Sequence, residues 1–434
     1  MKKTLIAVAA AAALTTSAFA ELSFGTWTNS IFTPVANDGL NTVSNMGMSW
    51  GGTARTGAID FHFKSEDELA GMDFSYRTQA NNTPAAGDYS QIWVKPIDVL
   101  TLSYGKYDNN TLRGDICYGA WNWLRPTSAW IEGDEGLLMS GNGKTGVQVE
   151  VTPVDGLYIQ AVLPVDDKTT ETADVFKNMQ AGFAYNIEGV GKIKAQLILK
   201  NTAKKEAVAA AAAKWVDKDG ETVADPADFT AAEAIKAAGG KYVAAVAAAE
   251  AQDAYLDKAI EAEFDLTSVE NLWVGVGFKM TMIDKMEDRK LQKSDKMKIA
   301  LGATYQVSDE LKVSASGAYF MYQKSGKEGA DPRFQAGAGV DYNLGDGMNL
   351  SADVRYLSKA KVADKEVEKS DHIAFSVGVT KGIGSNAMIG AAFQGTTNSG
   401  NLGGIEANGS IKADQTKKND KLVWAVPVRV SMWF

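Results

Sequence analysis

The last strand-like segment of this chain runs to its final residue. From Trp424 to Phe434 an apolar side chain occupies every second position, and the other register includes Arg429 and Ser431. A strict period of two is typical of a β-strand with two unlike faces. A soluble domain rarely places a long apolar edge at its end, because terminal residues fray and a free edge invites aggregation. A closed barrel has no such edge, so the segment predicts a barrel.

The first twenty residues predict an export signal. Lys2 and Lys3 precede an apolar run, and the small residues around Ala18 and Ala20 form a cleavage site, with cleavage expected after Ala20. The apolar run is too short to span a bilayer. The whole chain has a net charge of −9, and residues 1–20 contain two lysines and no acid, so the remainder carries −11. That charge disfavours nucleic acid as a partner.

Composition excludes two other classes. The single cysteine, Cys117, excludes an internal disulfide framework in an exported chain. After residue 20 the sequence has no apolar run of about 18 residues, so a membrane-spanning helix is not expected. Aromatic and aliphatic residues instead alternate with Ser, Thr, Asp and Lys. This pattern fits a barrel with a polar interior.

Turn signals indicate the architecture. Between consecutive short turns lie two strand-like runs and one longer polar loop, the alternation expected of an up-and-down barrel. We therefore predict an all-β, transmembrane, antiparallel up-and-down β-barrel of about 18 strands, with 16 as the alternative. Five aromatic residues near the short turns or the terminus would form one aromatic girdle. These are Phe63, Tyr185, Tyr305, Tyr342 and Phe434. The short turns are expected at residues 65–68, 95–99, 153–155, 188–191, 268–271, 308–310, 344–347 and 383–386.

The first long loop of interest spans residues 108–144 and follows the third outward strand. Its three tryptophans argue against disorder, and a loop of this length is usually functional. With the export signal, the even-stranded barrel and the terminal Phe434, the chain resembles the bacterial outer-membrane porins of the general diffusion type; whether it is of the spirochaete type is left open. In that family the third loop folds into the lumen, the terminal aromatic is read by the barrel-assembly machinery, and trimers are common.

Two sets of residues are candidates for the channel. Opposed charges on a loop and on the facing wall would set a transverse field that favours polar solutes. The candidate constriction loop contains Asp108, Arg113, Asp115, Trp121, Trp123, Arg125, Trp130, Glu132, Asp134 and Glu135. The candidate lumen wall contains Arg55, Arg77, Arg355 and Arg429, with small inward residues at Gly337, Gly339, Ala374, Ser376 and Gly378.

A second unusual segment is the Ala-rich insertion at residues 202–262, in the expected fifth loop. Its composition favours helix. Asp225-Pro226 would start one helix, Gly239-Gly240 would end it, and residues 241–262 would form a second helix. We expect a helical hairpin outside the membrane.

Enzyme chemistry is not supported. The two histidines, His62 and His372, are expected about 20 Å apart along the barrel axis, too far for a dyad or a metal site. We expect no enzyme activity, metal or cofactor.

The predicted function is a water-filled channel for passive diffusion of small hydrophilic solutes and ions, in contact with outer-membrane lipids. Two alternatives stay open: a sugar-selective channel that uses the loop tryptophans, and a surface adhesin that uses the insertion.

Overall fold

The computed structural model describes residues 21–37, 42–48, 55–79, 84–116, 124–125, 137–139, 143–165, 172–202, 207, 214–224, 229–243, 254–284, 295–322, 324–325, 328–329, 332–362, 365–366, 368, 370–397 and 422–434. Two compact units are formed, one by residues 1–199 and 258–434 and the other by residues 200–257.

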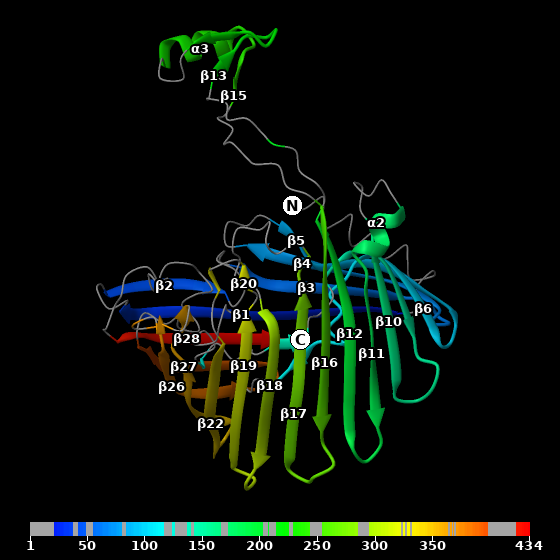
Figure 1. The fold of residues 1–434 in the computed structure, drawn as a ribbon, viewed down its shortest axis with the longest axis vertical. Coiled ribbons are helices and arrows are strands. Elements are labelled where there is room, and N and C mark those ends of the chain that lie inside the picture. Colours follow the sequence, from blue (N-terminus) through cyan, green and yellow to red (C-terminus); the bar gives the residue numbers. More distant parts are fainter. Residues whose placement is uncertain are drawn as a thin grey trace. The chain divides into compact units, whose positions relative to one another are not determined.

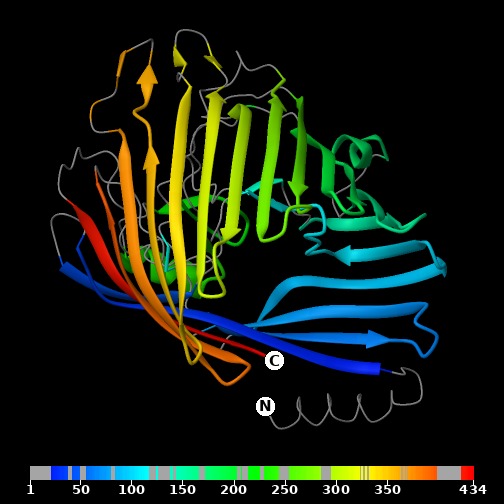
Figure 2. The same cartoon turned by 90° about the horizontal axis from the view of Figure 1, so that it is seen from below.

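The larger unit is a closed antiparallel β-barrel. Each of its strands pairs with the next along the chain, and β28 (Val423–Trp433) closes the ring on β1 (Glu21–Asn37) (Figures 1 and 2). The other wall strands are β3 (Arg55–Lys64), β4 (Ala70–Gln79), β5 (Pro84–Ile97), β6 (Leu100–Lys106), β9 (Thr145–Val151), β10 (Leu157–Pro164), β11 (Gln180–Ile187), β12 (Gly191–Thr202), β16 (Tyr255–Leu266), β17 (Leu272–Met282), β18 (Asp295–Gln306), β19 (Leu311–Tyr322), β22 (Arg333–Gly345), β23 (Met348–Leu357), β26 (His372–Ile383) and β27 (Ala387–Thr396).

A further strand, β2 (Thr42–Met48), brings the sheet to nineteen strands. It shares one wall position with β3, because β1 pairs with β3 over its first half and with β2 over its second. The barrel therefore has 18 wall positions. The predicted fold class and strand number are confirmed, and the alternative of 16 strands is wrong.

All eight expected short turns join consecutive wall strands at one end of the barrel. The last residue lies at the same end as the turn between β26 and β27: the Trp433 amide donates to the carbonyl of Asn386 at 3.0 Å, and Phe434 exchanges backbone hydrogen bonds with Thr26. The terminal residue is thus part of the closing ladder.

The two faces of the wall differ as the alternation predicts. Large apolar side chains such as Ile299, Leu301 and Val377 are exposed on the outer face, whereas Gln394, Ser376 and Asp353 on the inner face are buried. Four of the expected girdle aromatics are exposed on the outer surface. They are Tyr185, Tyr305, Tyr342 and Phe434.

Short elements lie between the wall strands. A helix, α2 (Thr172–Lys177), precedes β11, and three small hairpins occupy other long loops. The hairpins pair β7 (Gly114–Asp115) with β8 (Leu137–Met139), β20 (Lys324–Ser325) with β21 (Glu328–Gly329), and β24 (Lys361–Val362) with β25 (Lys365–Glu366). No helix in the described part of the chain is long and apolar enough to cross a membrane.

The smaller unit differs from the expected helical hairpin. Three short strands, β13 (Lys214–Val216), β14 (Thr222–Ala224) and β15 (Lys241–Val243), form a sheet with β13 in the middle. The helix α3 (Phe229–Ala237) matches the first expected helix and places Ile235 against Gly240. In the described part of residues 241–262 the second expected helix is not found: residues 241–243 are strand β15, and residues 255–262 belong to wall strand β16. The alanine-rich stretch between them lies outside the described residues.

Candidate constriction site

The third long loop, residues 108–144, begins with a polar anchor to the wall. The hydroxyl of Tyr107 donates to the carbonyl oxygens of Ser103 and Gly146, and Tyr107 is buried. Two residues further along the chain, Nδ2 of Asn109 donates to Oε1 of Glu150 at 3.1 Å and to the hydroxyl of Tyr158 at 3.0 Å. Both partners lie on β9 and β10, so the chain leaves β6 toward the barrel interior.

The loop then runs along the inner face of β11, β12 and β16. Leu112 is buried against Gly182, where an added Cβ would lie 2.8 Å from its Cδ1 atom. The ammonium of Lys194 donates to the carbonyl oxygen of Arg113 at 3.1 Å. At Gly114 an added Cβ would overlap the carboxylate of Glu263. These contacts place the first part of the loop directly on the wall.

The next contact lies on β17 and β18. The backbone carbonyl of Ile116 occupies the space that a side chain at Gly302 would need, and its Cδ1 atom would be 2.9 Å from a Cβ at Gly275. Ile116 is buried. Glycine inside a strand often marks the close approach of another backbone, and Gly302 has that role here, whereas Gly275 makes room for side chains.

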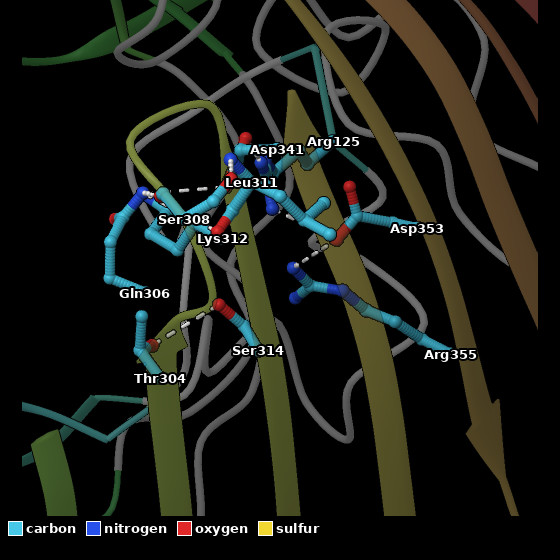
Figure 3. A network of polar contacts seen from close by, with 10 residues as sticks. All are labelled: Arg125, Thr304, Gln306, Ser308, Leu311, Lys312, Ser314, Asp341, Asp353 and Arg355. Carbon is cyan, nitrogen blue, oxygen red and sulfur yellow. Dashed lines mark hydrogen bonds and ion pairs between the residues drawn. The ribbon is translucent and has the colours of Figure 1, made fainter. Parts of the chain in front are cut away.

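Leu124 and Arg125 bring the loop to the far side of the barrel. Leu124 lies against Gly390 of β27, where an added Cβ would be 2.8 Å from its Cδ1 atom. The buried guanidinium of Arg125 donates to Oδ1 of Asp353 at 3.1 Å and pairs with Asp341. Figure 3 shows Arg125 between these carboxylates of β22 and β23. The described loop residues thus contact wall strands from β9 to β27, and the expected infolded third loop is confirmed.

The carboxylates that hold Arg125 have further partners. Asp353 lies 3.7 Å from Arg355, and Asp341 lies 3.4 Å from the ammonium of Lys312 (Figure 3). The neighbouring wall positions are small, because Gly337 and Ala374 flank Arg355 in the register and Gly339 and Ser376 flank Asp353. The expected small inward residues therefore leave room for this charged cluster.

A second charged cluster lies on β12, β16 and β17. The ammonium of Lys194 is 2.6 Å from Glu263, and that of Lys279 is 2.7 Å from Glu261. The Glu261 and Glu263 side chains are 0% and 1% exposed, and Nε2 of Gln196 donates to Glu261 at 2.5 Å. A buried carboxylate is tolerated only with such partners. We call the inner faces of β11, β12, β16–β18, β22, β23 and β27 the covered wall.

Another part of the interior remains open to water. The inner faces of β3, β4 and β5 near the turn at residues 65–69 form what we call the β3–β5 wall. There Nδ1 of His62 lies 2.8 Å from Oδ1 of Asp73, and Nε2 of Gln91 donates to Oδ2 of Asp73 at 3.2 Å. The His62 side chain is 44% exposed. Among the described residues, no group of three Asp, Glu, His or Cys side chains is arranged to hold a metal ion.

The candidate wall arginines fall in different surroundings. Arg355 belongs to the cluster on the covered wall with Arg125, so it does not face the loop from the opposite side. Arg77 pairs with Asp88 and lies 4.6 Å above the ring of Trp27. Nε of Arg429 donates to the hydroxyl of Ser431 at 2.9 Å. Arg55 lies at the start of β3.

The candidate loop residues are only partly placed. Asp108 is exposed at the root of the loop, Arg113 contributes its carbonyl, Asp115 lies in β7, and Arg125 joins the covered wall. Trp121, Trp123, Trp130, Glu132, Asp134 and Glu135 lie outside the described residues.

Sequence reasoning missed the apolar loop residues that contact the wall, Leu112, Ile116 and Leu124. The candidates taken from the loop sequence were its charged residues and its tryptophans. A usable signal was present in the wall, where Gly182, Gly275, Gly302 and Gly390 occupy inward positions of otherwise regular strands. Inward glycines had been interpreted only as space for water.

A scan of the sequence against known protein families finds no match, and no curated protein sequence matches it. Solved structures with a similar fold include a porin that is 13% identical, with a TM-score of 0.41 and coverage of 95% of this chain and 100% of that chain. An anion-selective porin from Comamonas acidovorans is 10% identical, with a TM-score of 0.41 and coverage of 95% and 99%. OmpT, an outer membrane protein of Vibrio cholerae in a trimer form, is 10% identical, with a TM-score of 0.42 and the same coverage.

Proposed function

We propose that this protein is an outer-membrane porin, a channel through which small hydrophilic solutes and ions diffuse passively. One observation carries the proposal: an 18-position closed barrel has an apolar outer face, a polar inner face and a long loop docked inside it. Apolar side chains on the outside of a closed barrel suit a lipid environment, because every backbone group pairs within the wall. A polar interior of this circumference suits water.

Export to the outer membrane is part of the proposal. Residues 1–20 carry the features of a cleaved signal, and β1 begins at Glu21, the first residue after the expected cleavage site. N-terminal sequencing of the protein recovered from outer membranes tests this. A protein that retains residues 1–20 or fractionates elsewhere would contradict it. A homotrimer stays a prediction, to be read from the mass of the detergent-solubilised protein.

The docked loop supports a constriction inside the channel. Arg125, Lys194 and Glu263 hold it against one side of the wall, so the remaining path is narrowed at the level of the loop. We propose that Asp115, Glu132, Asp134 and Glu135 contribute negative charge to this narrow part. At an effective dielectric constant near 20, a charge about 4 Å from an ion contributes on the order of 4 kcal/mol before screening.

Single-channel recording of the refolded protein in planar bilayers tests the function. We expect stepwise ohmic conductance, and replacement of the four acids by Asn or Gln should shift the reversal potential toward anion preference. The shift should shrink as ionic strength rises. Replacing the exposed Asp108 by Asn is the matched control at the root of the loop. A bilayer that stays closed would refute the channel, and an unchanged reversal potential at low salt would refute the constriction charges alone.

A further inference from the structure

The β3–β5 wall has a feature that passive diffusion does not require. Trp93 of β5 is paired in register with Gly71 of β4, and an added Cβ at Gly71 would overlap the indole ring of Trp93. Both positions belong to the inward register, so the ring lies over the glycine on the inner face of the barrel. It is half-buried, as expected for a ring with one face against the backbone.

A row of hydrogen-bonding groups borders this ring. His62, Asp73 and Gln91 are direct register partners on three adjacent strands, two residues along the strands from the pair of Gly71 and Trp93. Asp73 holds both neighbours, through Nδ1 of His62 at 2.8 Å and Nε2 of Gln91 at 3.2 Å. These hydrogen bonds use Nδ1 of His62 and Nε2 of Gln91. His62 and Gln91 each have a second polar atom that can bond a solute.

Most charged groups around the ring already have a partner. Asp73 contacts Nδ1 of His62, and the ammonium of Lys64 lies 2.8 Å from Glu21 and 2.7 Å from Glu68. The ammonium of Lys95 lies over the Trp93 ring, 5.3 Å from its centre, and adds a donor there. An aromatic ring next to fixed donors and acceptors suits a neutral molecule with many hydroxyl groups.

We propose that Trp93, His62, Asp73 and Gln91 form a binding subsite for neutral polyhydroxylated solutes, that is, sugars or polyols. The sugar packs against the indole beside the ammonium of Lys95, and its hydroxyl groups bond to Lys95 and to the row on β3–β5. This inference rests on the proposed channel and names a solute class for it. It is independent of the loop tryptophans, which lie outside the described residues.

Titration with glucose and sucrose, with ion current as the readout, tests the subsite. We expect a saturable fall in conductance beyond that of a viscosity-matched polyethylene glycol solution. Trp93→Leu should raise the half-blocking sugar concentration about tenfold, and Trp93→Phe should restore part of the effect. Asp73→Asn should raise it severalfold, because the anionic acceptor that fixes His62 and Gln91 is lost.

Trp273→Leu is the matched control, because the indole of Trp273 also lies over an inward glycine, Gly275, but on the covered wall. Its register partner is Thr304, whose hydroxyl lies 3.1 Å from that of Ser314. We expect sugar block to be unchanged in this variant. A fall in conductance that follows viscosity alone, or an equal loss of block in both tryptophan variants, would overturn the subsite while leaving the channel in place.

Sugar-dependent tryptophan fluorescence of the refolded protein separates the two proposals. A saturable change that Trp93→Leu abolishes and Trp273→Leu retains would support the subsite even if no current were recorded. Absence of any saturable change in the wild-type protein, together with normal ion current, would refute the subsite and keep the porin.

Discussion

The covered wall and the β3–β5 wall are built from the same kinds of inward residue, yet these residues have different surroundings. On the covered wall Glu261 and Glu263 are buried and paired with lysines. On the β3–β5 wall His62 and Asp73 form a similar close contact but remain partly exposed. The difference is the third loop, whose described residues fill the space above the covered wall. Charged residues in a barrel interior can thus either bind the loop or face the solutes in the lumen. The position of the loop determines which of the two they do.

The largest effect is expected at the seam where β28 meets β1. Phe434 exchanges two backbone hydrogen bonds with Thr26, and the residue is 72% exposed. Phe434→Asp places a charge at the membrane rim and removes the terminal aromatic, so we expect processed protein that fails to insert. Outer-membrane fractionation and heat-dependent gel mobility measure this. Phe434→Tyr is the control, and normal insertion of the Asp variant would refute the assembly role.

Breaking a buried ion pair comes next. Lys194→Met leaves Glu263 buried without its nearest cation and removes the donor to the Arg113 carbonyl. We expect a loss of about 3–5 kcal/mol in the free energy of unfolding. Lys64→Met, at the rim of the β3–β5 wall, removes ion pairs with the exposed Glu21 and Glu68 and should cost far less, because water screens them. Denaturant unfolding of the refolded barrel measures both losses of stability. Equal losses in the two variants would contradict the difference between the covered wall and the β3–β5 wall.

Adding a methyl group at an inward glycine tests loop docking more finely. Gly302→Ala places its Cβ on the carbonyl oxygen of Ile116, so the loop must shift; overpacking of this kind costs about 1–3 kcal/mol. At Gly25 of β1 the nearest atom to an added Cβ is 3.7 Å away, so Gly25→Ala should be neutral. We expect faster protease cleavage of the loop and altered conductance only for Gly302→Ala. Matching behaviour of the two variants would argue that the loop is not held at β18.

The smallest effect concerns the turn below the β3–β5 wall. The carboxylate of Asp67 accepts hydrogen bonds from the Ser65 hydroxyl at 2.6 Å and from the Leu69 amide at 3.1 Å, and these bonds lower the pKa of Asp67. A lowered pKa contributes stability above the unfolded-state value, about 4, that is lost as pH falls through the folded value. Asp67→Asn should therefore be less stable than wild type at pH 7 and equal to it in strong acid. A difference that persists in acid would assign the effect to packing.

The sequence by itself determined the barrel. Alternation along each strand, the eight turn signals and the terminal Phe434 depend on local period and turn chemistry, and the structure confirms the 18 positions they predicted. The infolded loop was expected from a family resemblance and is also confirmed. The expected second helix is wrong at residues 241–243 and 255–262, because these residues pair as strands β15 and β16.

Only the tertiary structure decided what the inward residues do. Arg355 looked like a free wall charge, but it shares Asp353 with Arg125, a residue more than two hundred positions away in the sequence. Gly302 was not singled out in the sequence, but it receives the backbone of Ile116. Such roles depend on which distant strands the loop contacts. The local alternation of residues in the sequence carries no information about those contacts. The alternation placed these residues inside the barrel, and long-range packing separated those that hold the loop from those that face water.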